Sequence, residues 1–82
     1  MEATEIINEL TKIWRDQLDD DSIVLNPQTT ANDVEGWDSL THIQLIVATE
    51  KKFRIRFASS EIMNFKNIGD LTDAVLKKTA NG

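Results

Sequence analysis

The chain has 82 residues, no cysteine, one histidine and a formal net charge of -5 at pH 7. This length fits one domain, and the acidic balance argues against nucleic acid as a partner, because phosphates require a basic face. Without cysteine there is no disulfide, thiolate nucleophile or cysteine-ligated metal, and a single histidine cannot build a multi-histidine metal site. No apolar run is long enough to span a membrane. We therefore expect a soluble, monomeric, cytoplasmic domain without a metal.

The first expected element is an amphipathic helix over residues 3–18. Its apolar residues recur at helical spacing and fill one arc of a helical wheel; they are Ile6, Ile7, Leu10, Ile13, Trp14 and Leu18. An acidic run at 19–21 follows and ends the helix, because negative charge is unfavourable at a helix C-terminus. That run lacks the glycine and distant glutamate of an EF-hand, so we interpret it as a solvated loop.

A long loop is expected over residues 19–37, which contain Pro27 and several polar turn formers. Four apolar residues interrupt it and should pin it onto the bundle: Ile23, Val24, Leu25 and Val34. A loop this long in a small domain tends to be ordered for a purpose.

The helical pattern returns over residues 38–53 and contains two apolar arcs. One arc holds Leu45, Ile46 and Phe53, and the other holds Leu40, Ile43 and Val47. A single arc is enough to attach a surface helix to a core. The second arc is therefore either buried against another short helix or exposed as a strip for a partner or ligand.

The remaining chain predicts an extended connector and two further helices. The connector should place Ile55 or Phe57 in the core, and serines 59–60 should cap a short helix over 60–64. An N-cap at Asn67 starts a last helix over 68–79, whose expected buried residues are Ile68, Leu71, Ala74 and Val75. We expect an all-α, small four-helix bundle with a long first loop and a short third helix, forming one domain over residues 1–82.

Ser39 is the candidate functional residue. It directly follows Asp38, a good N-cap, and would lie in the first turn of the second helix. Unpaired backbone N–H groups at that position would favour an anion, such as a phosphate ester, on its hydroxyl. From the residues alone, a serine that merely caps the helix is the commoner arrangement. A Ser39–His42–Asp38 hydrolase is disfavoured, because the Gly-x-Ser-x-Gly elbow is absent and His42 falls in the core arc.

The segment 36–46 reads GWDSLTHIQLI and resembles the attachment region of acyl carrier proteins, whose second helix starts with Asp-Ser-Leu. The resemblance extends over nearly the whole chain, including EKKF at 50–53 and IRF at 55–57. It implies that a separate phosphopantetheinyl transferase places 4′-phosphopantetheine from coenzyme A on Ser39. The thiol of that arm would carry an acyl group as a thioester, which would explain how a chain without cysteine handles thiol chemistry.

The resemblance also implies a carrier that is not itself an enzyme and that docks on several enzymes. Expected partners besides the transferase are acyl-loading and acyl-processing enzymes: a ligase, a ketosynthase or an acyltransferase. The docking surface implied by the resemblance consists of Leu40, Ile43 and Val47 with the acids Glu35, Asp38 and Glu50. The beginning at Met1 and the short tails favour a free-standing carrier.

The second helix departs from familiar fatty-acid carriers, because Thr41, His42 and Gln44 are uncharged and two lysines follow Glu50. This favours a dedicated pathway, such as polyketide, fatty-acid-like or other specialised acyl biosynthesis. A peptidyl or aminoacyl carrier is an alternative, although such carriers typically show Gly-Gly-His-Ser or Gly-Gly-Asp-Ser. The other alternative is a helical interaction module in which Ser39 only caps. The sequence leaves the cargo and the pathway open.

Overall fold

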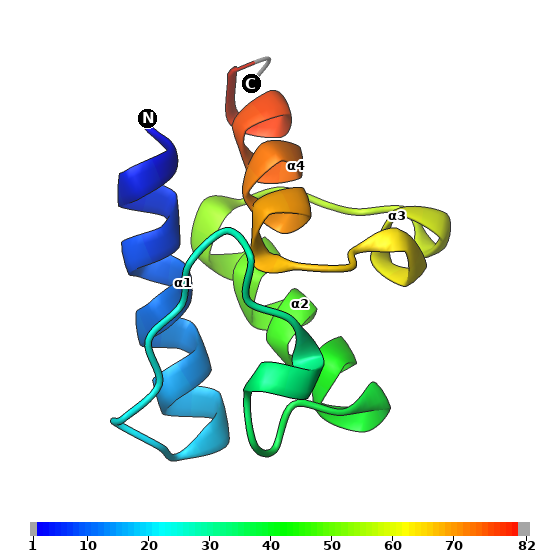
Figure 1. Cartoon of the computed structure of the whole chain (residues 1–82). Coiled ribbons are helices and arrows are strands. Elements are labelled where there is room, and N and C mark those ends of the chain that lie inside the picture. The colour runs from blue at the N-terminus through cyan, green and yellow to red at the C-terminus, as the bar shows by residue number, and fades with distance from the viewer. Residues whose placement is uncertain (1, 81–82) are drawn as a thin grey trace.

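The computed structural model describes residues 2–80. Every regular element in that range is helical: α1 (Ala3–Leu18), the 3₁₀ turn η1 (Ala31–Asp33), α2 (Ser39–Phe53), α3 (Ser59–Asn64) and α4 (Ile68–Ala80). The expected all-α bundle with a long first loop and a short third helix is confirmed (Figure 1). The turn η1 was not predicted. Residues 1, 81 and 82 of the expected domain lie outside the described residues.

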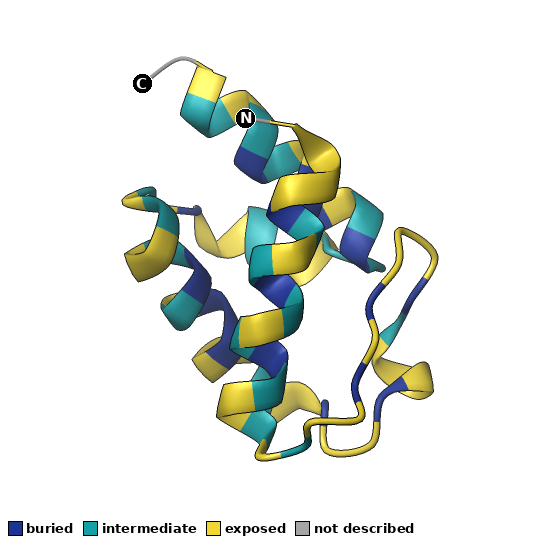
Figure 2. Cartoon of the chain, turned by 90° about the vertical axis from the view of Figure 1, so that its left-hand side faces the viewer, coloured by how far each residue is buried: buried dark blue, intermediate teal, exposed yellow. Residues whose placement is uncertain are grey.

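Helix α1 contributes three side chains to the core. Ile6, Leu10 and Trp14 are fully buried, and their spacing of four places them on one face. Buried and exposed positions alternate along this helix in Figure 2. Asp19 ends the helix in the left-handed conformation at φ 52, and its backbone N–H donates to the Arg15 carbonyl. Close backbone packing joins α1 to α2 and to α4.

The long loop packs onto the bundle through side chains and backbone. Ile23, Leu25, Val34 and Trp37 are buried, whereas Val24, predicted as an anchor, is 72% exposed. The prediction for Val24 is wrong because consecutive residues of an extended segment point to opposite sides.

Two backbone hydrogen bonds attach the same loop to the start of α4. Ile68 N donates to Thr29 O at 2.9 Å, and Gly69 N donates to Pro27 O at 2.9 Å. A Cβ at Gly69 would lie 3.0 Å from Pro27 O, so glycine permits this close approach.

The two apolar arcs of α2 have different environments. Leu45 and Ile46 are fully buried, and so is Thr49, whose hydroxyl donates to Leu45 O at 2.8 Å. Phe53, expected in the core, is only half-buried at the end of the helix. The second arc is exposed rather than covered by another helix.

Helix α3 begins one residue before the expected start, and its cap differs from the prediction. Its N-cap is Ala58, with no side-chain cap, so the serines do not cap it. Instead Glu61 Oε1 accepts from the Ala58 N–H at 2.8 Å. None of the α3 residues is buried, and the helix stands at the side of the bundle in Figure 1. The preceding connector buries Phe57 and leaves Ile55 half-buried.

Helix α4 starts where Asn67 Oδ1 accepts from Asp70 N at 2.8 Å. This is the predicted N-cap contact. Three of the four predicted core residues are buried, whereas Ala74 is only half-buried. Thr72 is buried in addition, because its hydroxyl donates to Ile68 O at 2.8 Å and thereby satisfies its polar group.

Candidate functional site

The junction between the long loop and α2 is held by a compact set of hydrogen bonds. Asp38 Oδ1 accepts from Leu40 N at 2.9 Å and from Thr41 N at 3.0 Å. The Thr41 hydroxyl donates to Gly36 O at 2.7 Å and accepts from Asp38 N at 2.8 Å. Gly36 has φ 90, in the left-handed region, which costs glycine little. These bonds fix the direction in which α2 leaves the loop.

Asp38 caps the helix as predicted, and this changes the electrostatics expected at Ser39. The N–H groups of Thr41 and Leu40 donate to the carboxylate and hold the pKa of Asp38 below its usual range. Two of the N–H groups expected to favour an anion are therefore already paired with Asp38. The helix N-terminus offers a phosphate less stabilisation than the sequence argument assumed.

Ser39 is exposed at the first position of α2, on the rim of a cavity of about 430 Å³. The cavity lies between the end of the loop, α2 and α3. Its apolar wall is formed by Trp37, Ile43, Ile62, Met63 and Phe65. Its charged lining residues within the described chain are Asp38 and Lys66. The site therefore combines a reachable hydroxyl with space beside it for an attached group.

His42 also lines this cavity, and both of its ring nitrogens have hydrogen-bond partners. Trp37 Nε1 donates to Nδ1 at 3.1 Å, and Nε2 lies 3.1 Å from the Ile62 carbonyl oxygen. The imidazole is therefore engaged away from Ser39, and the hydrolase arrangement has no geometric support. Helical spacing places His42 in the core arc but cannot show these partners, since Ile62 lies on another helix.

An exposed apolar strip runs along α2 from the Ser39 end. Leu40, Ile43 and Val47 are 79%, 50% and 41% exposed, so this arc is available to another molecule. Met63 on α3 is 81% exposed and lines the same cavity as Ile43. The sequence analysis missed Met63, because the place of a short helix beside α2 cannot be read from its own periodicity.

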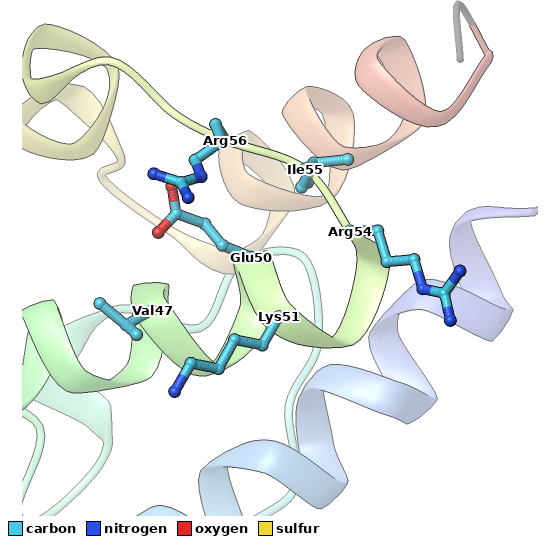
Figure 3. A pocket seen from close by; sticks show the side chains of 6 residues that line it. All are labelled: Val47, Glu50, Lys51, Arg54, Ile55 and Arg56. Atoms are coloured by element: carbon cyan, nitrogen blue, oxygen red, sulfur yellow. The ribbon is translucent and has the colours of Figure 1, made fainter.

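The two ends of this strip carry opposite charge. Glu35 and Asp38 are exposed near Ser39. At the far end, the carboxylate of Glu50 accepts from Phe57 N at 2.8 Å, so this acid has a partner inside the chain. Exposed cations surround that end, namely Lys51, Arg54 and Arg56. Figure 3 shows the two arginines pointing in opposite directions from the segment after α2.

Comparison with known proteins agrees with this arrangement. Residues 8–75 match the family described as "Phosphopantetheine attachment site". An acyl carrier protein from Acidothermus cellulolyticus is 31% identical over 77 residues, covering 94% of this chain and 83% of the relative. One from Thermosynechococcus vestitus is 29% identical over 80 residues, covering 98% and 99%. The chain belongs to the acyl carrier protein family.

A solved structure supports the same conclusion. The solution structure of a holo acyl carrier protein from Geobacter metallireducens has 50% sequence identity and a TM-score of 0.86. The match covers 93% of this chain and 87% of that one. This chain is thus an acyl carrier protein, and its cofactor is covalently bound 4′-phosphopantetheine. An exposed serine beside a cavity fits such a group.

Residues 2–80 contain no group of three or more histidine, cysteine, aspartate or glutamate side chains placed to hold a metal ion. None of its helices combines the length and the apolar character needed to cross a bilayer.

Proposed function

We propose that Ser39 is the attachment residue and that the chain carries acyl intermediates as thioesters on its phosphopantetheine arm. The observation that carries this proposal is the exposed Ser39 at the start of α2, on the rim of the cavity. A tethered group needs a hydroxyl that a second protein can reach, and it needs no base in the carrier itself. The imidazole of His42 is hydrogen-bonded to Trp37 and Ile62, which accords with a serine that is activated by a second protein.

The attachment step exchanges a phosphoanhydride bond of coenzyme A for a phosphate ester bond to Ser39. The Ser39 oxygen attacks the phosphorus of coenzyme A that bears the pantetheine, and a P–O bond forms. The pyrophosphate bond breaks, and adenosine 3′,5′-bisphosphate leaves with the bonding electrons. The serine proton passes to a base of the transferase. The transferase and its magnesium activate the serine and coenzyme A, and the carrier contributes only the position of the Ser39 hydroxyl.

Enzymes that load and process the acyl group dock along α2. Leu40, Ile43 and Val47 supply the apolar contact, and Glu35 and Asp38 supply charge near the arm. Glu50 contributes less than an unpaired acid would, because its carboxylate is bonded to Phe57 N. The cations at the far end distinguish this surface from one that is acidic throughout, which favours enzymes of a dedicated pathway. Catalysis lies with those enzymes, in the cytoplasm.

Intact mass measurement tests the proposal. We expect incubation with coenzyme A, magnesium and a broad-specificity phosphopantetheinyl transferase to add one phosphopantetheine to the wild-type protein and none to Ser39→Ala. Ser60→Ala is the matched control, since Ser60 is also exposed near a helix start, and it should be modified normally. An unmodified but folded wild type would overturn the proposal, as would equal modification of Ser39→Ala.

A further inference from the structure

Helix α3 packs against the core through the half-buried side chain of Ile62, with Phe65 just after the helix. It has no buried residue of its own. Glu61 pairs with Lys78 of α4 at 3.3 Å, and Phe65, just after the helix, meets Phe57 edge-on with ring centroids 5.1 Å apart. The link from α3 to α2 beside Ser39 is the contact of His42 Nε2 with the Ile62 carbonyl. These polar contacts therefore add to the partial apolar packing of Ile62 and Phe65 in fixing the position of α3.

The hydrogen-bond partners determine the state of the His42 ring. The indole N–H of Trp37 can only donate, so Nδ1 of His42 must accept through its lone pair. The ring proton then resides on Nε2 and is donated to the Ile62 carbonyl. His42 is thus held as the neutral Nε2–H tautomer. A second proton on Nδ1 would face the indole proton and remove that bond.

Trp37, which donates to His42, is itself packed in the core. It is 7% exposed, and its ring meets Trp14 of α1 in a T-shaped contact with centroids 5.3 Å apart. The rings of Trp37 and His42 are nearly parallel, with centroids 6.0 Å apart and an interplanar angle of 17°. A continuous path of contacts therefore leads from the core of α1 through Trp37 and His42 to the backbone of α3.

We infer that His42 is a positioning residue of the carrier site. Its neutral imidazole holds α3 and the end of the loop against α2, and it thereby sets the width of the cavity beside Ser39. The part of this inference that concerns the attached arm rests on the proposed attachment at Ser39. The link itself is a property of the chain with or without the arm.

Two charged side chains line the same cavity as His42. Asp38, the N-cap of α2, has its carboxylate engaged by Leu40 N and Thr41 N. Lys66 lies on the segment between α3 and α4. Because its N–H partners lower the pKa of Asp38, that carboxylate protonates in a more acidic range than an ordinary aspartate.

Nuclear magnetic resonance of the unmodified protein tests the link directly. We expect the nitrogen shifts of His42 to report the Nε2–H tautomer. At a fixed pH, the Trp37 indole N–H signal, assigned by its loss in Trp37→Phe, should move in His42→Phe, because phenylalanine offers no acceptor to the indole. The Nδ1–H tautomer, or an indole signal at the same position in the wild type and in His42→Phe, would overturn the inference.

Two substitutions at His42 separate positioning from simple packing. His42→Phe keeps a ring but offers no donor or acceptor, so amide exchange in α3 should accelerate by about twofold to tenfold, as expected for one lost hydrogen bond. His42→Gln keeps both a donor and an acceptor, so it should restore most of the protection. Equal exchange in His42→Phe and wild type would contradict a positioning role. Amides of α1 serve as the internal control.

The same variants, carrying phosphopantetheine, test whether His42 affects the environment of the attached arm. After modification, the chemical shifts of the α3 amides in the wild type should differ from those of the unmodified protein. His42→Phe should change this pattern of shift differences, whereas His42→Gln should preserve it. An identical pattern in all three proteins would refute the control of the cavity by His42. Failure of modification at Ser39 would instead refute the proposed function. The tautomer and the amide exchange of the unmodified protein would still test the His42 link independently.

Discussion

Helices α1 and α3 contribute to the carrier in opposite ways. Helix α1 inserts Ile6, Leu10 and Trp14 completely into the core. Helix α3 fully buries no residue; it is held by the half-buried Ile62, an ion pair, a ring contact and the His42 link. Burial of apolar area is the larger stabilising term, and exposed polar contacts contribute little each. Loss of the contacts of α3 should therefore lower the free energy of unfolding less than loss of core packing in α1.

The largest effect should come from the core of α1. Leu10→Ala should lower the free energy of unfolding by about 2–5 kcal/mol, through lost transfer energy and the cavity left behind. Urea unfolding followed by circular dichroism measures it. Asn8→Ala, at an exposed position of the same helix, is the matched control and should change stability by less than about 0.5 kcal/mol. Similar losses in the two variants would contradict the contrast between the helices.

An intermediate effect is expected from the apolar wall that α3 provides. Ile62 is half-buried and lines the cavity, so Ile62→Ala should cost about 1 kcal/mol, a fraction of the value for full burial. The same urea experiment should place it between Leu10→Ala and Asn8→Ala. A loss as large as that of Leu10→Ala would show that α3 belongs to the main core after all.

The smallest effect should be electrostatic and confined to α3. The N–H of Ala58 donates to Glu61 and, with Lys78 nearby, holds the pKa of that carboxyl below its usual range against the opposing effect of burial. A depressed folded pKa means that the stabilisation is present above the unfolded pKa and is lost as pH falls through the folded one. Amide protection of α3, corrected for intrinsic exchange, should therefore decrease in that acidic range in the wild type.

Glu61→Gln provides the comparison, because it cannot titrate. Its α3 protection should be weaker at neutral pH and flatter across the acidic range, while α1 amides stay unchanged. Asp16→Asn, at an exposed acid of α1, should retain the wild-type profile. Protection of α3 that is independent of pH in the wild type would remove Glu61 from the contacts that hold this helix.

Much of the fold follows from local rules, and the sequence captures it. Apolar residues at helical spacing placed α1 and α2, and the N-cap preference of Asp38 placed the start of α2 next to Ser39. Where two local signals competed, the prediction was less accurate. The serines near α3 are good caps by type, yet Glu61 satisfies the Ala58 N–H instead. The periodicity of α2 showed two apolar arcs but could not tell which of them would be covered.

By itself, the sequence determined the helices, the position of Ser39 at a helix start and, through its resemblance to acyl carrier proteins, the family. Only the tertiary structure decided which arc of α2 stays exposed, that Glu50 is bonded to Phe57 N, and that His42 joins Trp37 to Ile62. The physical reason is the range of the interactions. Helical spacing and capping act within a few residues, whereas the partners of a side chain such as His42 depend on how separate elements pack. The wall beside Ser39 is built from that second kind of contact.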